Sequence, residues 1–213
     1  MTTMPKILPA LIKAVASTIE QNAEEVTALD QAIGDGDHVT NLQRGLDALV
    51  QQADEIAQLE WPAAIQKVGM TLLSTMGGAS GSLFGTLFIS MSKAMADKNE
   101  FNQQVWADVF SQGVEAVKKR GKSEAGEKTM LDVLIPVAES MLQGVDINSI
   151  NQVAIDGMES TRDMIATKGR ASYLEEKSIG HIDAGARTSQ LMICAIVDEI
   201  NNEANLSHKS NFL

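Results

Sequence analysis

Three aspartates lie close together in one short segment of the sequence: Asp30, Asp35 and Asp37. Gly34 and Gly36 lie between them, and glycine allows sharp turns because it has no Cβ atom to clash at positive φ. A tight loop can therefore direct all of these carboxylates at one point. Carboxylate oxygens crowded in this way repel each other unless a hard divalent cation lies between them, and magnesium or calcium is the natural choice. Magnesium in proteins usually binds phosphate groups as well.

A capped turn without any metal would use the same residue types. Aspartate and glycine are the commonest turn residues, so Asp37 or His38 could simply cap a helix that starts near Val39. A calcium-binding EF-hand loop fails, because its sixth position would be Thr40 rather than glycine and its twelfth Leu46 rather than glutamate. The aspartates alone leave a cation site and a capped turn as alternatives.

Glycines collect in further segments where a helix cap would need only one. Gly77-Gly78-Ala79-Ser80-Gly81 can expose backbone N–H groups at the start of a helix, where phosphate oxygens bind well. A close crossing of two helices would require the same small residues, so both interpretations remain open. The stretch from Gly121 to Thr129 has the glycine spacing of a P-loop, but Glu127 separates the second glycine from Lys128 and no strand precedes it.

Two later loops also carry polar side chains between glycines. Arg170 follows Gly169 and can offer a planar fork to phosphate. His181 and Asp183 lie between Gly180 and Gly185, where polar anchoring of the loop is the preferred interpretation. The loops together indicate a magnesium–nucleotide site.

The elements that must position these loops are helices. Apolar residues recur at helical spacing almost throughout the chain, and no alternating stretch predicts a strand. The expected helices cover residues 8–19, 42–50, 65–76, 84–95, 105–117, 130–141, about 148–167 and about 186–201. We therefore predict one all-α domain of about eight helices over residues 1–213, with residues 201–213 as a frayed tail.

The composition limits the cellular setting and the partners. A net charge of −11 argues against nucleic acid or an anionic membrane surface as the main partner. The single cysteine, Cys194, rules out an internal disulfide and fits a reducing compartment. No uncharged run reaches the length of a membrane span. These features predict a cytoplasmic protein.

Five blocks of the sequence, in order, resemble the nucleotide-binding L subunit of dihydroxyacetone kinases, the DhaL family. They cover the chain from about Leu29 to Ala186 and comprise Ala32–Asn41, Gly77–Gly81, Gly121-Lys122 with Lys128-Thr129-Met130, Lys168–Leu174 and Ser178–Asp183. The resemblance implies a closed barrel of antiparallel helices with ADP or ATP bound in the loops at one end. It also implies that the aspartate triad holds two magnesium ions that bridge the nucleotide phosphates.

The resemblance further assigns the remaining contacts by motif position. The residues expected to line the phosphates are His38, Val39, Thr40, Asn41, Ala79 and Ser80. Gly121 and Met130 are expected to border the adenine. Arg170 and the segment Asp183, Ala184 and Gly185 are expected to complete the pocket.

The same family implies the reaction and the partners. Its members transfer the γ-phosphoryl group to dihydroxyacetone, which a separate K subunit holds covalently through a histidine. Separate L subunits generally keep ADP bound and have it recharged by a phosphohistidine carrier of the sugar phosphotransferase system, whereas fused K–L chains use ATP. This chain of 213 residues is expected to follow the first mode. A homodimer is left open.

The sequence departs from the family pattern in three places. The family usually has glycine at Val39, Gly-Glu-Arg-Ser at Glu175–Ser178 including arginine at Lys177, and proline at Ala184. These departures leave two alternatives: an L subunit of a split ATP-dependent kinase for a related ketose such as erythrulose, and a nucleotide-sensing paralogue without catalysis.

Overall fold

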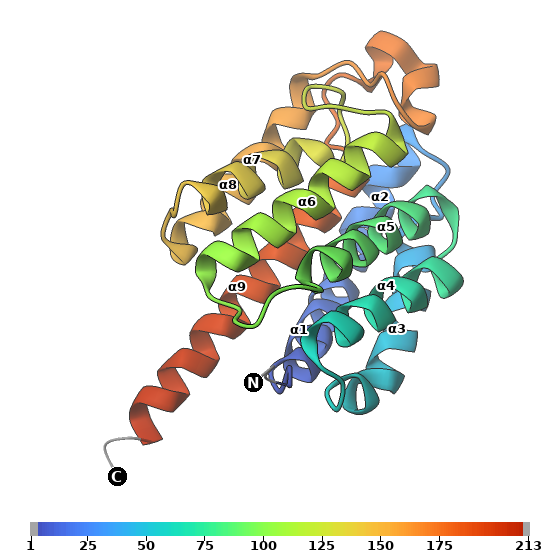
Figure 1. Ribbon diagram of the computed structural model, residues 1–213. Coiled ribbons are helices and arrows are strands. Elements are labelled where there is room, and N and C mark those ends of the chain that lie inside the picture. Colours follow the sequence, from blue (N-terminus) through green and yellow to red (C-terminus); the bar gives the residue numbers. More distant parts are fainter. Residues whose placement is uncertain (1–3, 211–213) are drawn as a thin grey trace.

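The computed structural model describes the backbone of residues 4–210 and the side chains as far as residue 205. The regular secondary structure in this part of the chain is entirely helical (Figure 1). They are α1 (Leu8–Gln21), α2 (Ala23–Ile33), α3 (His38–Ile56), α4 (Trp61–Thr75), α5 (Gly78–Met95), α6 (Gln103–Gly121), α7 (Leu131–Leu142), α8 (Ile147–Ser160) and α9 (Ala184–Ser210), with 3₁₀ segments η1 (Thr161–Asp163) and η2 (Arg170–Ser178). The prediction of an all-α fold is confirmed. None of the helices described has the length and apolar character needed to cross a membrane.

Eight of the helices close into a ring. Helix α1 packs against α3, each helix from α3 to α8 packs against the next in the chain, and α9 packs back against α1 (Figure 1). These are the eight helices that the apolar stripes predict. Helix α2 is additional and lies beside the ring, where it contacts α3, α9 and η2. The predicted closed barrel of helices is therefore confirmed.

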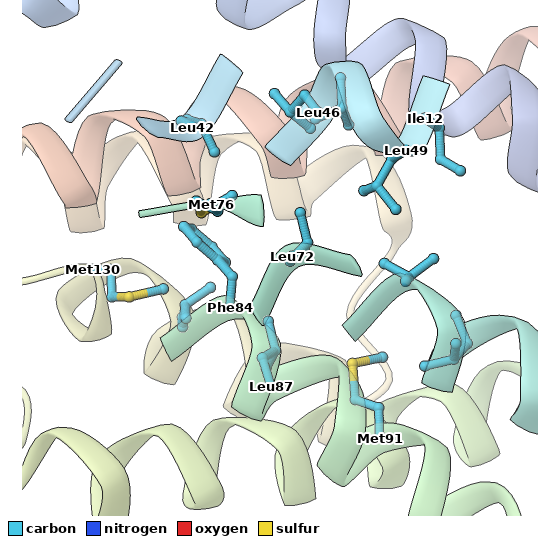
Figure 2. Packing of buried hydrophobic residues seen from close by; sticks show 14 of the residues in the cluster. Ile12, Leu42, Leu46, Leu49, Leu72, Met76, Phe84, Leu87, Met91 and Met130 are labelled. Carbon is cyan, nitrogen blue, oxygen red and sulfur yellow. The ribbon is translucent and has the colours of Figure 1, made fainter. Parts of the chain in front are cut away.

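Apolar side chains from most of the ring fill its interior. Most of the residues labelled in Figure 2 come from helices α3, α4 and α5, among them Leu42, Leu46, Leu72, Phe84 and Leu87. Each of these side chains is almost fully buried. Because apolar burial contributes about 25 cal/mol per Å² of surface removed from water, this interior supplies the main driving force for closing the ring.

Three expectations about the helices were wrong. Helix α8 ends at Ser160 instead of about residue 167, since the chain continues as η1 and Ala166 then packs in a separate small cluster with Ile33 and Ala171. Helix α9 begins at Ala184 and continues to Ser210, well past its expected end near residue 201, while fraying of the tail stays a prediction. Residues 211–213 of the expected tail lie outside the described part. Helix α2 was not expected, since it buries only Val26 and Ile33 fully.

The loops singled out in the sequence meet at one end of the ring, which we call the site end. His38, at the start of α3, contacts Ser80 near the start of α5 and Thr188 in α9. Arg120, at the end of α6, donates to the Ser82 hydroxyl of α5 over 2.8 Å. Helices α3 and α5 therefore begin at the site end, and α6 finishes there. An aromatic cluster of Trp61, Phe101 and Trp106 lies instead where α4 and α6 begin, at the other end.

Candidate functional site

The three aspartates meet at the site end. Each offers a carboxylate oxygen, and these atoms all lie within 4.8 Å of one another. Asp35 and Asp37 are exposed and lie in the loop between α2 and α3, whereas Asp30 is half-buried and lies in the last turn of α2. The prediction that the carboxylates converge is confirmed. The expectation that one loop carries all of them was wrong for Asp30, which belongs to the helix that the sequence did not reveal.

The glycines between the aspartates are required by the geometry. A Cβ atom at Gly34 would lie 2.1 Å from Oδ1 of Asp30, so any side chain there would displace that carboxylate. Gly36 has a φ of +78°, which glycine adopts without strain. The loop is fixed further by the backbone N–H of His38, which donates to Oδ2 of Asp30 over 3.1 Å.

The arrangement could hold a hard divalent cation. Asp37 occupies the N-cap position of α3, but its side chain accepts no capping hydrogen bond. Asp35 forms an ion pair with Nε of Arg170. Three carboxylates facing one guanidinium leave a net negative charge, and oxygen ligands of this kind are those that magnesium and calcium prefer.

The imidazole of His38 connects three helices. Its Nδ1 lies 3.1 Å from the hydroxyl of Ser80, and its Nε2 lies 3.0 Å from the hydroxyl of Thr188. Burial lowers the pKa of His38, although the nearby aspartates, with Asp30 first, act in the opposite direction. Thr188 was not among the residues expected from the sequence. No local pattern could have revealed it, because its contact with His38 spans 150 residues of chain.

The glycine-rich start of α5 serves both packing and exposure. Gly77 lies against Asn41, so that a Cβ atom at Gly77 would be 2.4 Å from the Asn41 Oδ1 atom. Gly78 has a φ of +68°, and it is exposed together with Ala79. The first N–H groups of a helix have no partner within the helix. Both interpretations of this segment therefore hold, with Gly77 needed for the crossing and Gly78 to Ser80 free to present N–H groups to an anion.

The other residues expected to contact the nucleotide lie in the segments around the start of α5. Thr40 is exposed in the first turn of α3, and Gly121 is exposed at the end of α6. Met130 is 5% exposed and its side chain lies beside the core residues (Figure 2). A Cβ atom at Gly185 would lie 3.7 Å from the Met130 backbone nitrogen, so the fold brings these two segments together.

Lys128 is a site-end residue whose role the sequence did not reveal. It is 1% exposed, and its ammonium group donates to the backbone carbonyls of Thr161 and His181. Burial lowers its pKa, and Asp183 is the strongest of the acidic groups that oppose this shift. Three segments far apart in the sequence are therefore held together by one buried ammonium group.

Asp183 lies next to this lysine and caps α9. Its Oδ2 accepts a hydrogen bond from the Ala186 N–H over 2.8 Å, and its own N–H donates to the Thr161 hydroxyl over 3.1 Å. Burial raises the pKa of Asp183 to about 6, although the Ala186 N–H and Lys128 lower it. The expectation that His181 anchors its loop holds only for its backbone carbonyl, because its side chain is exposed.

The structure accounts for most of the departures from the family pattern. Val39 is buried in the core, so its side chain points away from the loop surface. Ala184 is the first residue of α9, a position where proline is common because its N–H is not needed. Glu175 has φ +50° and ψ −125°, a backbone conformation that favours glycine. Lys177 is exposed, and nothing in the structure explains it.

Replacing Glu175 by glycine is expected to raise the free energy of unfolding by about 1 kcal/mol, because the strained backbone would relax. Denaturant unfolding followed by circular dichroism measures the change. Glu176→Gly is the matched control, since the neighbouring exposed residue has no positive φ and should lose about 0.5–1 kcal/mol. Equal losses in both variants would show that position 175 stores no strain.

Comparison with known proteins gives consistent results. The DAK2 domain family matches residues 32–198. The ADP-binding subunit DhaL of PEP-dependent dihydroxyacetone kinase 1 from Listeria innocua is 43% identical over 179 residues, which are 84% of this chain and 88% of that protein. The corresponding Escherichia coli subunit is 41% identical, over 80% of this chain and 85% of that protein.

Longer proteins match over only part of their length. The L-erythrulose 1-kinase of Mycolicibacterium smegmatis is 29% identical over 89% of this chain but only 35% of that protein. The crystal structure of the dihydroxyacetone kinase of C. freundii in complex with AMP-PNP and Mg²⁺ superposes with a TM-score of 0.74 at 21% identity, covering 93% of this chain and 34% of that one. At this identity the structural match supports the fold.

Proposed function

The chain belongs to the DhaL family of DAK2-domain proteins, and from that premise we propose that it is the ADP- and magnesium-binding subunit of a dihydroxyacetone kinase. The observation that carries the proposal is the convergence of Asp30, Asp35 and Asp37 beside an exposed glycine-rich helix start. A phosphotransferase needs mainly positioning and charge stabilisation at the phosphates. This end of the ring offers both.

The proposed roles follow from the position of each group. The three carboxylates would hold two magnesium ions, which neutralise phosphate charge when bound. The backbone N–H groups of Gly78, Ala79 and Ser80 would contact phosphate oxygens, aided by the positive end of the α5 dipole. The backbone of Val39, whose side chain is buried in the core, would line the phosphates together with Thr40 and Asn41 from the start of α3. Asn41 accepts a hydrogen bond from Arg44 over 3.3 Å.

The adenine would lie between the end of α6 and the starts of α7 and α9. Gly121 and Met130 would border it, and the backbone of Asp183 to Gly185 would close the pocket beside Met130. Arg170 would remain close to the phosphates, because its ion pair with Asp35 already places the guanidinium beside the metal ligands. Its side chain is 69% exposed, which leaves it free to contact a phosphate as well.

Nucleotide binding is expected to require magnesium, because the carboxylates repel phosphate unless a cation lies between them. ADP with magnesium at 100 times its dissociation constant should stabilise the chain by about 2.7 kcal/mol, seen as a rise in melting temperature. ADP with a chelator should produce no rise. An equal rise in both conditions would contradict the role proposed for the aspartates.

The partners in the proposal are a K subunit that holds the ketose and a phosphohistidine carrier that recharges bound ADP in the cytoplasm. Three relatives support these partners. This chain covers most of the length of each, and they are named as subunits of PEP-dependent or PTS-dependent dihydroxyacetone kinases. The erythrulose kinase relatives are about three times as long as the matched region, so they support the alternative of a split ATP-dependent kinase less well.

Turnover of dihydroxyacetone is expected only when the chain is mixed with a K subunit and a phosphorylated carrier protein. Purified chain alone should give no product, and ADP should remain bound during turnover because several N–H groups and two cations share its phosphates. Enzymatic assay of each mixture tests this. Steady turnover with ATP and a K subunit alone would identify the chain as part of a split ATP-dependent kinase.

A further inference from the structure

The hydrogen bonds around the His38 ring decide which of its two nitrogens carries the proton when the ring is neutral. A neutral imidazole has one N–H donor and one bare nitrogen acceptor. The ring lies between the hydroxyls of Ser80 and Thr188, at 3.1 Å from Nδ1 and 3.0 Å from Nε2. Thr188 is fully buried, so water cannot replace either of its contacts.

The hydroxyl of Thr188 has a second contact, which decides between the two tautomers. It lies 3.1 Å from the backbone carbonyl of Gly185, and a carbonyl can only accept. When the single hydroxyl proton of Thr188 is donated to Gly185, the oxygen accepts from Nε2–H of His38. The bare Nδ1 then accepts the hydroxyl proton of Ser80. All three contacts are hydrogen bonds in this arrangement, whereas the other tautomer leaves the contact between Thr188 and Gly185 without a proton.

We propose that Thr188 is a positioning residue that holds His38 in its Nε2–H tautomer and thereby orients the Ser80 hydroxyl. This inference rests on the proposed function, because Ser80 belongs to the segment Gly78 to Ser80 that is proposed to bind the phosphates. With its proton given to His38, the Ser80 hydroxyl presents only lone pairs to the ligand side, and it cannot donate to a phosphate oxygen. Phosphate contacts at this point are then left to the backbone N–H groups of Gly78, Ala79 and Ser80.

The same chain of hydrogen bonds links the two halves of the site. Thr188 lies one turn after Asp183–Gly185, the segment expected to close the nucleotide pocket. His38 directly follows the metal loop, and its own N–H holds Asp30. A change at Thr188 therefore alters the orientation of groups around the phosphates even though its side chain is buried behind His38 and touches no ligand.

Nitrogen-15 NMR of labelled histidine reports the tautomer directly in the nucleotide-free chain. The chain has three histidines, and loss of one signal in His38→Gln assigns the ring. We expect Nε2–H in the native chain and in Thr188→Ser, which keeps the hydroxyl. Thr188→Val offers no acceptor to Nε2–H, so the proton should move to Nδ1 and be donated to Ser80. An Nδ1–H ring in the native chain, or an unchanged tautomer in Thr188→Val, would overturn the proposal.

Ser80→Ala gives a second test that does not disturb the buried threonine. If Thr188 sets the tautomer, the ring should stay Nε2–H in this variant, because the bonds from Thr188 to His38 and Gly185 are intact. A switch of tautomer in Ser80→Ala would assign the control to Ser80 and overturn the proposal. This arm decides the question even if Thr188→Val does not fold.

Calorimetric titration with ADP and magnesium gives the functional consequence. Thr188→Val should tighten binding by up to about tenfold, because the Ser80 hydroxyl then accepts from Nδ1–H and can donate its own proton to a phosphate oxygen, and Thr188→Ser should stay within about twofold of the native chain. Thr71→Val is the matched control, because Thr71 is also buried in a helix and donates to Gln52 over 3.3 Å away from the site. It should change neither affinity nor tautomer, and an equal change of affinity there, or weaker binding in Thr188→Val, would make Thr188 a residue of the fold alone. Failure of the native chain to bind ADP would reject the proposed function, while the tautomer measurement would still stand.

Discussion

Asp37→Asn is expected to remove magnesium-dependent ADP binding while the helical fold stays intact. The side chain is exposed and accepts no capping hydrogen bond, so asparagine of the same shape fits without strain. It removes one of the three negative oxygen ligands that face the proposed ions. Changes in the groups that merely orient a metal ligand already cost about 10–100-fold in affinity, so loss of a ligand should cost about 100-fold or more. Calorimetric titration of ADP with magnesium measures this loss.

The unliganded variant should be at least as stable as the native chain, because one of three mutually repelling carboxylates is neutralised. Asp54→Asn is the matched control, since Asp54 is also an exposed aspartate and lies farther along the same helix. It should leave both binding and melting temperature unchanged. Unfolding of Asp37→Asn would instead favour a structural role for the turn, and retained tight binding would exclude Asp37 as a ligand.

The barrel could be predicted from the sequence because each of its eight helices buries an apolar stripe longer than two turns. Leu42, Leu46 and Leu49 repeat at helical spacing and all face the interior. Helix α2 escaped detection because it has no long apolar stripe: Val26 joins the main core cluster, and Ile33 packs in the small cluster with Ala166 and Ala171. The end of α8 was misplaced for a related reason, since Ile165 and Ala166 continue the apolar spacing although Ala166 packs in another cluster.

The aspartates could be predicted because the glycines that allow them to converge lie beside them in the sequence. Groups that meet only through the closed fold left no such local signal. Arg170 contacts Asp35 across 135 positions (170 − 35), and Lys128 reaches carbonyls 33 and 53 residues away. The resemblance to the DhaL family assigned Arg170 to the expected nucleotide pocket, but it did not indicate that the arginine pairs with Asp35.

The comparison with the family pattern draws attention to Glu175, which the spacing of residues in this chain alone did not single out. Glycine is usual in the family at the position of Glu175, and the backbone there adopts positive φ in this chain. The conformation of this turn is therefore one reason for glycine at this position. Val39 and Ala184 likewise replace family residues without closing the site, because one is buried in the core and the other begins α9.

Lys128→Met is expected to lower the free energy of unfolding by roughly 2–5 kcal/mol, the largest stability loss among the variants considered. Methionine fills most of the space but leaves the carbonyls of Thr161 and His181 buried without their donor. Each buried polar group left unpaired costs about 1–3 kcal/mol. Denaturant unfolding measures the loss, and Lys67→Met is the matched control. The Lys67 side chain is 39% exposed and its ion pair with Glu55 is long, at 3.5 Å, so its loss should cost about 0.5 kcal/mol or less.

The loss in Lys128→Met should also depend on pH through Asp183. Burial holds the pKa of Asp183 at about 6 in the folded chain, above its ordinary value of 3.8. The folded chain therefore keeps a proton that the unfolded chain releases, and stability falls as pH rises through this window. Lys128 lowers that pKa, so removing it raises the pKa further and extends the loss above pH 6.

Unfolding of Lys128→Met at pH 5 and pH 8 separates the loss due to the unpaired carbonyls from the loss due to the charge of Asp183. The difference from the native chain should be larger at pH 8, where the Asp183 carboxylate is forced to ionise without its neighbour. Adding Asp183→Asn should recover that pH-dependent part, because asparagine carries no charge and still offers an oxygen to the Ala186 N–H. The part due to the unpaired carbonyls should remain. A loss of equal size at both pH values would show that Lys128 acts on the carbonyls alone and does not control the charge of Asp183.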